Sequence, residues 1–219
     1  ELINSHGVPI RKLLITMPPR HAKSFYGTIN FPAYCMMRDP TREIMVAGYN
    51  SELAATFGRQ TREIVTNPAN LKSFPKFKLS QESRAVDFWK TVEGGAYYAV
   101  GMGGTTTGRG ANILIVDDPY KTREEADSTV KRNKIWDFYT ASLLTRMQPH
   151  RNGKPPILIV THTRWNPDDI GARIMESDEF KRGEWFHLNY PAIRTIESGV
   201  EIKRSDLPKD DPRYIPARI

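Results

Sequence analysis

Cysteine is almost absent from this 219-residue chain, which carries Cys35 alone. One cysteine cannot form an internal disulfide, and a thiol in an apolar helical stretch is typical of packing, so we expect an intracellular protein. No run approaches the ~18 apolar residues of a membrane span. The first residues lack a signal-peptide pattern, and no internal repeat is visible. These absences argue against a disulfide-stapled secreted domain and against a membrane protein.

The composition is that of a basic globular domain. Hydrophobic residues make up 39% of the chain, enough to bury a full core in one large α/β domain. Lys and Arg number 32 against 25 Asp and Glu, giving a net charge of +7 and a pI near 9.5. This balance favours a polyanionic partner, with simple solubility as the alternative reading.

The segment LLITMPPRHAKSF, residues 13–25, has the parts of a phosphate-binding P-loop. An apolar strand enters a Pro-bounded loop that ends in Lys23 and Ser24, and a helical pattern follows. Lys23 would bridge the terminal phosphates and Ser24 would place its hydroxyl on Mg²⁺. Met17 and Ala22 stand where the two glycines of the usual pattern belong. Alone, the segment could equally be a chance strand-to-helix turn.

A second aliphatic run, NILIVDDP at residues 112–119, ends in two carboxylates. A continuous aliphatic run indicates a strand covered on both faces, and ligands of α/β proteins bind at its carboxyl end. Asp117 can then hold the Mg²⁺ shell while Asp118 orients or deprotonates a water, which is the Walker B arrangement. A third run, ILIVTHTRW at residues 157–165, ends in Thr161, His162 and Thr163.

The remaining pattern alternates strands and helices. Further strands are predicted at 12–16, 43–47 and 185–190, and a β-hairpin at 88–92 and 97–100. Helices are predicted from 23 to about 38, with Pro32 as a kink or break, and over 51–66, 121–147 and 167–175. The glycine-rich stretch 101–110 is no GxGxxG fingerprint, because a strand follows it where a helix should.

Four ordered blocks carry a family resemblance. MPPRHAKS, ILIVDDPYKTREEADS, WDFYTASLLTRM and VTHTRWNPDDIGARI resemble the ATPase domain of the large terminase subunit of tailed bacteriophages and prophages. That family's motor packages DNA into a capsid. The resemblance covers roughly residues 12–190.

The resemblance implies an additional-strand, RecA-like P-loop NTPase with a mainly parallel sheet flanked by helices and a β-hairpin insertion. The strand ending at Thr161 would lie between those ending at Met17 and Asp117, making residues 161–163 a coupling motif beside the γ-phosphate. Implied cofactors are ATP and Mg²⁺. Implied partners are double-stranded DNA, a portal protein, a small terminase subunit and further copies in a ring, in the host cytoplasm.

The same resemblance suggests the domain organisation. Residues 1–190 are expected to form the ATPase domain, and residues 191–219 a tail or linker toward a nuclease domain. The family's nuclease uses clustered acidic residues, and no such cluster on strands follows Tyr190. We therefore expect a motor fragment without the nuclease, and without the adenine-binding segment that the family carries upstream.

The nucleotide-binding residues expected from the loop are Pro19, Arg20, His21, Ala22, Lys23 and Ser24. Family members commonly read PPRHGKS, so Ala22 replaces a glycine. A methyl group at a position needing φ > 0 would cost on the order of 1 kcal/mol. Ser24 and Asp117 are the expected metal ligands, whereas His21 and His162 are expected to be hydrogen-bonding residues.

Two roles stay open. The catalytic base is Asp118, or alternatively Glu124 or Glu125, because many P-loop motors place Glu after the Walker B Asp. A guanidinium that neutralises the γ-phosphoryl charge speeds transfer ~10³- to 10⁵-fold. Arg20 could supply it in cis, and Arg109 could supply it in trans to a neighbouring subunit.

The sequence therefore predicts a Mg²⁺-dependent ATPase that moves double-stranded DNA, contacting its phosphates instead of its bases. One alternative is a helicase-like, nucleic-acid-stimulated ATPase, which would need a second motor domain. The other is a P-loop-derived module that binds nucleotide with weak or no hydrolysis.

Overall fold

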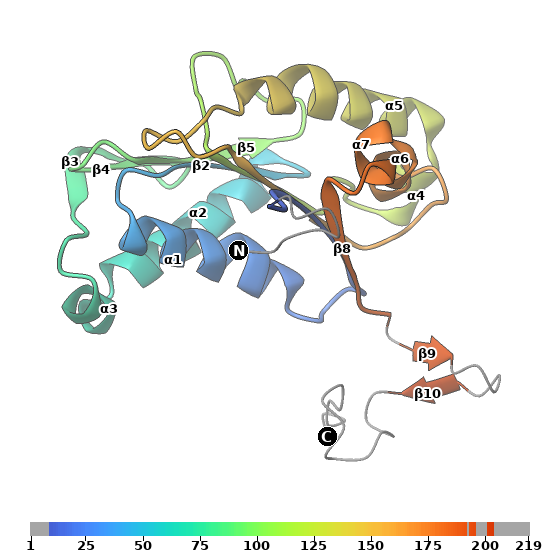
Figure 1. The fold of residues 1–219 in the computed structure, drawn as a ribbon, viewed down its shortest axis with the longest axis horizontal. Helices are drawn as coiled ribbons and strands as arrows, with labels where there is room; N and C mark the ends of the chain where they lie inside the picture. The colour runs from blue at the N-terminus through green and yellow to red at the C-terminus, as the bar shows by residue number, and fades with distance from the viewer. Residues whose placement is uncertain (1–8, 192, 196–200, 204–219) are drawn as a thin grey trace.

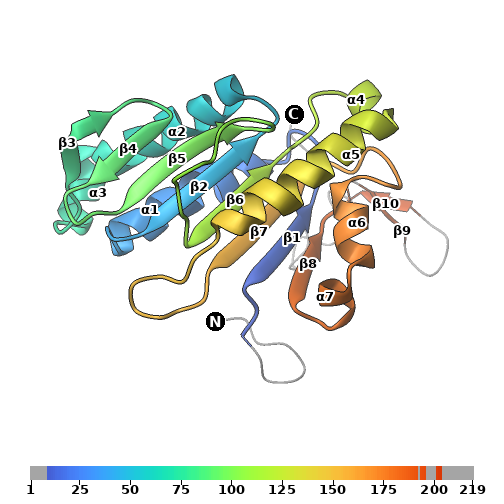
Figure 2. The same ribbon diagram turned by 90° about the horizontal axis from the view of Figure 1, so that it is seen from above.

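The computed structural model describes residues 9–191, 193–195 and 201–203, and its centre is an eight-stranded sheet (Figures 1 and 2). The strand order is β3-β4-β5-β2-β6-β7-β1-β8. The strands are β1 (Lys12–Thr16), β2 (Glu43–Gly48), β3 (Leu79–Arg84), β4 (Phe88–Thr91), β5 (Ala96–Gly101), β6 (Ile113–Asp117), β7 (Ile157–His162) and β8 (Trp185–Asn189).

Helices cover both faces of this sheet (Figure 1). On one face lie a π-helical segment (Phe25–Asn30), α1 (Phe31–Arg38), α2 (Ser51–Thr66) and α3 (Pro68–Ser73). On the other lie α4 (Arg123–Asp127), α5 (Thr129–Phe138), a π-helical segment (Tyr139–Leu143), a 3₁₀ turn (Leu144–Arg146), α6 (Ile170–Glu176) and α7 (Asp178–Lys181).

All the strands from β5 to β8 along the sheet run parallel to one another. Strand β7 lies between β1 and β6, as the family resemblance implied. The register pairs Asp117 with Thr161 and Thr16 with His162. The ends of the three aliphatic runs therefore meet at one edge of the sheet. The predicted α/β P-loop architecture is confirmed.

The predicted hairpin is also confirmed, with β4 antiparallel to β5. Beyond it lies β3, an edge strand that the sequence did not predict. Its residues, LSQESR, are mostly polar and show no apolar alternation, so its pairing rests on backbone hydrogen bonds to β4.

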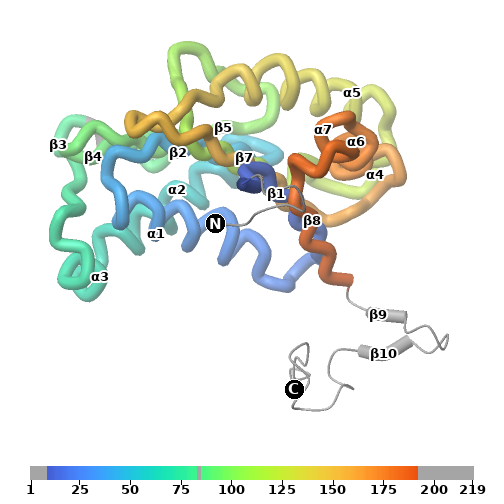
Figure 3. The backbone as a smooth tube through the Cα atoms, viewed as in Figure 1, coloured from blue at the N-terminus to red at the C-terminus, as the bar shows by residue number. Residues whose placement is uncertain are grey.

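The helical run after the P-loop is continuous, as the tube in Figure 3 shows. Pro32 was predicted to kink or break it. Proline lacks an N–H and its ring crowds the carbonyl four residues earlier. The helix is π-helical just before Pro32, where the N–H of Phe31 donates a hydrogen bond to the carbonyl of Tyr26, five residues earlier. A local change of helical pitch thus replaces the break.

The other predicted helices form with shifted limits. Asn50 caps α2, and the predicted 121–147 helix is divided at Ser128, which caps α5. The helix predicted from Pro167 begins at Ile170, because the Asp169 side chain caps it by accepting the N–H of Ala172.

Every residue of β6 is buried, as is every residue of β7 except Ile157, whereas Leu13 and Ile15 of β1 are half-buried. Cys35 on α1 is partly buried, and burial raises its pKa to about 11, so it packs as a thiol. Among the described residues no helix is long and apolar enough to cross a membrane. Most of the predicted tail, 191–219, lies outside the described residues, and its described part includes β9 (Ile193–Thr195) paired with β10 (Glu201–Lys203).

Candidate active site

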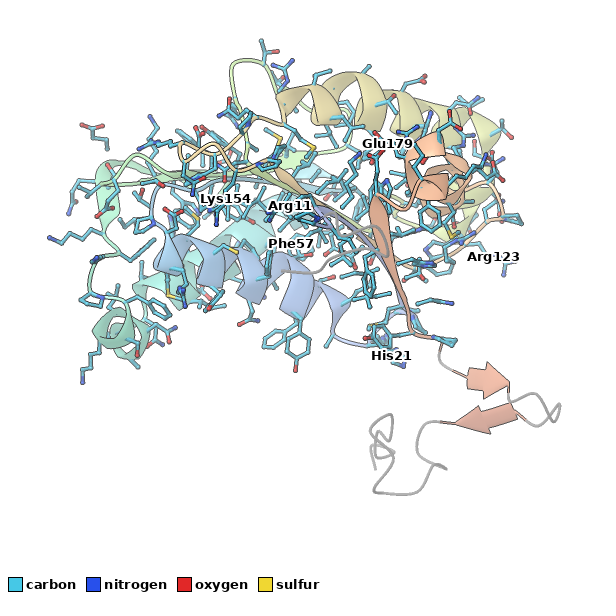
Figure 4. The ribbon with its side chains drawn as sticks, viewed as in Figure 1. Arg11, His21, Phe57, Arg123, Lys154 and Glu179 are labelled. Atoms are coloured by element: carbon cyan, nitrogen blue, oxygen red, sulfur yellow. The ribbon has the colours of Figure 1, made fainter. Side chains whose placement is uncertain are left out.

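The loop between β1 and the following helix takes a conformation that L-residues rarely adopt. Arg20 has φ +64° and Ala22 has φ +61°, both in the left-handed region. The positive φ predicted for Ala22 is therefore confirmed, and its methyl group carries a strain of about 1–2 kcal/mol. Figure 4 shows His21 on this loop, at the same end of the molecule as Arg123.

The side chain of Lys23 turns inward from the loop to Asp118. Its Nζ lies 2.5 Å from Oδ2 of Asp118, and only 6% of the Lys23 side chain is exposed against 29% for Asp118. Asp118 itself has φ +41°, a strained backbone conformation directly after β6. The P-loop lysine and the second carboxylate of the Walker B run are thus brought into direct contact.

Asp118 is also hydrogen-bonded to residues 161–163, the segment expected to be the coupling motif. Its Oδ1 accepts the backbone N–H of Thr163 at 2.9 Å, and its own N–H donates to the carbonyl of Thr161 at 3.0 Å. The hydroxyl of Thr163 donates to the carbonyl of Met17, whose N–H donates to the carbonyl of His162, both at 3.3 Å. Hydrogen bonds therefore join all three motifs.

Asp117 is fully buried beside this pair. Burial, and then the charge of Asp118, raises its pKa to about 6, while the hydroxyls of Ser24 and Thr28 lower it. These two hydroxyls lie near the carboxylate, but neither of its oxygens accepts a hydrogen bond of normal geometry from the described residues. Two unpartnered carboxylate oxygens facing a serine hydroxyl are a donor set that suits a hard cation such as Mg²⁺.

His162 is 1% exposed and lies beneath the site. Burial lowers its pKa to about 4; the charges of Asp169 and Asp118 raise it, and those of Arg164 and Lys23 lower it. The ring is therefore neutral at neutral pH. Its Nε2 lies 3.8 Å from Oδ1 of Asp169.

The rival bases, Glu124 and Glu125, lie on α4 in a different setting. Oε2 of Glu125 accepts the N–H of Lys121 at 2.9 Å, and its own N–H donates to the hydroxyl of Thr122 at 3.3 Å. This pattern is a variant of the capping box, because Glu125 accepts the N–H of Lys121 and not that of the N-cap residue Thr122. Glu124 is exposed in the same turn. Of the three candidate bases, Asp118 is the one in contact with Lys23.

The two candidate arginines lie apart. Arg20 is exposed on the loop. The guanidinium of Arg109 lies over the stacked rings of Phe88 and Tyr98, 5.3 and 5.4 Å from their centroids. Arg109 therefore packs on the β4–β5 hairpin.

Sequence reasoning missed Arg164 and Asp169. Asp169 is fully buried, and its Oδ2 accepts Nε of Arg164 at 3.0 Å. Arg164 borders a cavity of about 610 Å³ that Pro18 and Pro19 of the P-loop also line. The run TRWNPDD held a signal for Asp169, because an acid after Asn-Pro is a common helix cap.

The loop that carries Lys23 joins β1 to a helix, and β7 lies between β1 and β6, the strand that ends in carboxylates. This arrangement defines a P-loop NTPase fold of the additional-strand type. The model of the family "Terminase large subunit, T4likevirus-type, N-terminal" matches residues 14–167. This is more than half of the chain, so the chain belongs to that family.

Solved structures agree on the fold. The HK97 bacteriophage large terminase is 16% identical with a TM-score of 0.54, over 86% of this chain and 37% of that one. The large terminase ATPase domain of Thermus phage P74-26 is 11% identical with a TM-score of 0.53, over 85% and 78%. The chain thus spans 37% of the HK97 protein's length. No curated protein matches the chain.

Proposed function

We propose that this chain is the ATPase engine of a terminase, hydrolysing ATP with Mg²⁺ to drive double-stranded viral DNA into a procapsid. The observation that carries the proposal is the connection Lys23–Asp118–Thr163, which joins the P-loop, the Walker B run and the coupling motif. A motor needs such a connection, because the state of the γ-phosphate must reach mobile parts of the protein.

Pro19 to Ser24 would cradle the phosphates, with Lys23 on the terminal ones. Ser24 and Asp117 would hold Mg²⁺, since both carboxylate oxygens of Asp117 lack partners among the described residues. The ion would neutralise charge on the phosphate oxygens. Asp117 starts with a raised pKa, and a nearby cation favours its ionised form.

Asp118 would be the base. Phosphate oxygens compete with Asp118 for the ammonium of Lys23, so binding draws Lys23 away and releases Oδ2 toward water. The N–H of Thr163 keeps Oδ1 in place during this exchange. Thr161 to Thr163 would then pass the change along β7.

Arg20 in cis or Arg109 in trans would stabilise the charge that develops on the γ-phosphoryl group. A trans role requires a ring of copies. The family resemblance further supports a portal protein and a small terminase subunit as partners, in the host cytoplasm. We also propose residues 1–190 as the ATPase domain and 191–219 as a tail.

Phosphate release measured with and without double-stranded DNA tests this function. The proposal expects ATP hydrolysis that depends on Mg²⁺ and on Lys23. Stimulation by single strands alone would favour a helicase-like enzyme. Tight nucleotide binding without any phosphate release would favour the binding module.

A further inference from the structure

Arg164 directly follows the coupling motif and forms part of the wall of the 610 Å³ cavity. Pro18 and Pro19, in the first half of the P-loop, line the same cavity. Its neighbour Thr163 bonds both to Asp118 and to Met17. Arg164 is thus one residue from the bonds that join the three motifs.

A buried carboxylate holds this arginine in place. Asp169 is fully buried and accepts Nε of Arg164, along with the backbone N–H groups of Trp165, Asn166 and Ala172. The bond to Nε leaves the two η nitrogens without a hydrogen-bond acceptor among the described residues, and 36% of the side chain is exposed. A guanidinium fixed at one nitrogen is preorganised to bind an oxyanion with the others.

The ring of His162 lies within electrostatic reach of both Arg164 and the Lys23–Asp118 pair. The buried ring of His162 responds, after burial itself, to the charges of Asp169, Asp118, Arg164 and Lys23 together. Both ends of the site therefore act on one ring. Lys23 is where the terminal phosphates of a nucleotide would bind.

We propose that Arg164 contacts the terminal phosphoryl group of the nucleotide bound in its own subunit, reporting a triphosphate to the coupling strand. This inference rests on the proposed function. Arg164 differs from Arg20 in being anchored by a buried carboxylate, and from Arg109 in lying beside the P-loop of its own chain. Asp169 is then the positioning residue for Arg164.

The test is equilibrium binding of ATPγS and ADP, by calorimetry with Mg²⁺, to the wild-type chain and Arg164→Gln. A contact with the terminal phosphoryl group alone predicts that ATPγS affinity falls about tenfold or more while ADP affinity changes less than about twofold. Arg164→Lys keeps the positive charge but lacks the planar guanidinium with its paired N–H donors, so its loss of ATPγS affinity should lie between those of the wild type and Arg164→Gln.

Arg123→Gln is the matched control. Arg123 lines the same cavity, but its side chain is 74% exposed and lies 3.7 Å from the exposed Asp127 instead of a buried anchor. Figure 4 shows it at the rim of the molecule. This variant should keep the wild-type ratio of the two affinities.

Equal losses for both nucleotides in Arg164→Gln and Arg164→Lys, at an unchanged melting temperature, would overturn the inference, as would no loss in either. If Arg123→Gln lowers the ratio as much, general cavity charge explains the effect and the inference also fails. Failure of the wild-type chain to bind either nucleotide would instead refute the proposed function.

Discussion

Lys23 and Asp118 form an ion pair with 2.5 Å between Nζ and Oδ2. Both side chains are largely shielded from water, so the contact is stronger than a surface pair. The same ammonium is the one that a P-loop offers to phosphate. If Lys23 binds the phosphates as proposed, nucleotide binding would free the candidate base Asp118 through this one side chain.

Asp118→Asn should bind ATP with near-normal affinity but hydrolyse it about 100-fold more slowly or worse. The amide keeps an oxygen for the Thr163 N–H but cannot accept a proton. Nucleotide titration and phosphate release on the same preparation measure the two effects.

Glu125→Gln is the control for that experiment. Glutamine can maintain the capping box at Lys121 and Thr122, so both stability and hydrolysis should stay close to wild type. Normal turnover in Asp118→Asn together with a loss in Glu125→Gln would mean that the base has been misassigned.

Ala22→Gly should raise the free energy of unfolding by about 0.5 kcal/mol. Relief of the strain at φ +61° outweighs the entropy that glycine adds to the unfolded chain. Nucleotide affinity should rise or hold. In Ala55→Gly, the same change inside α2, urea unfolding should reveal a loss of about 1 kcal/mol. A fall in both stability and affinity of Ala22→Gly would show that the loop does not need glycine.

The pH dependence of stability should carry a contribution from His162. Its pKa falls from an ordinary 6.5 to about 4 on folding. Between pH 4 and 6.5, His162 is therefore protonated in the unfolded chain but neutral in the folded chain. The contribution, on the order of 3 kcal/mol, is fully present above pH 6.5 and is lost as the pH falls to 4. The raised pKa of Asp117 has the opposite effect on stability, but it is present in both the wild type and His162→Gln. The difference between their unfolding free energies, measured with urea at each pH, therefore isolates the contribution of His162. A pH-independent difference would contradict the burial of a neutral ring.

If Arg109 acts in trans, hydrolysis per molecule should climb with protein concentration, and Arg109→Ala should lose the climb but keep nucleotide binding. Mixing Arg109→Ala with excess Lys23→Ala should restore partial activity, because each subunit supplies what the other lacks. Two inactive proteins that stay inactive together, where the wild type associates, would favour Arg20 in cis.

The sequence predicted those elements whose burial dictates their composition. The strands β6 and β7 could be predicted because strands covered on both faces need continuous aliphatic runs. The left-handed conformation at Ala22 could be predicted because members of the family commonly have glycine at this position. In each case one local requirement leaves one residue type.

Features fixed by distant partners could not be predicted. The polar strand β3 exists because β4 offers it backbone bonds, and the π turns exist because Pro32 follows them. Lys23 and Asp118 lie on loops that follow different strands, so the residues next to either of them in the sequence do not predict their ion pair. Arg164 looked like one surface charge among many until Asp169 proved to be buried beneath it.

Lys23 holds the phosphates of a hydrolysable nucleotide in the proposed function, and Lys23→Ala removes that contact. ATP hydrolysis, followed as phosphate release at saturating Mg²⁺, should fall about 100-fold or more, and ATP affinity should drop as well, because the ammonium is lost. Lys12→Ala, which removes a lysine bound to Glu179 and Glu184 at the far end of β1, should leave both unchanged. Near-normal hydrolysis by Lys23→Ala would contradict the account.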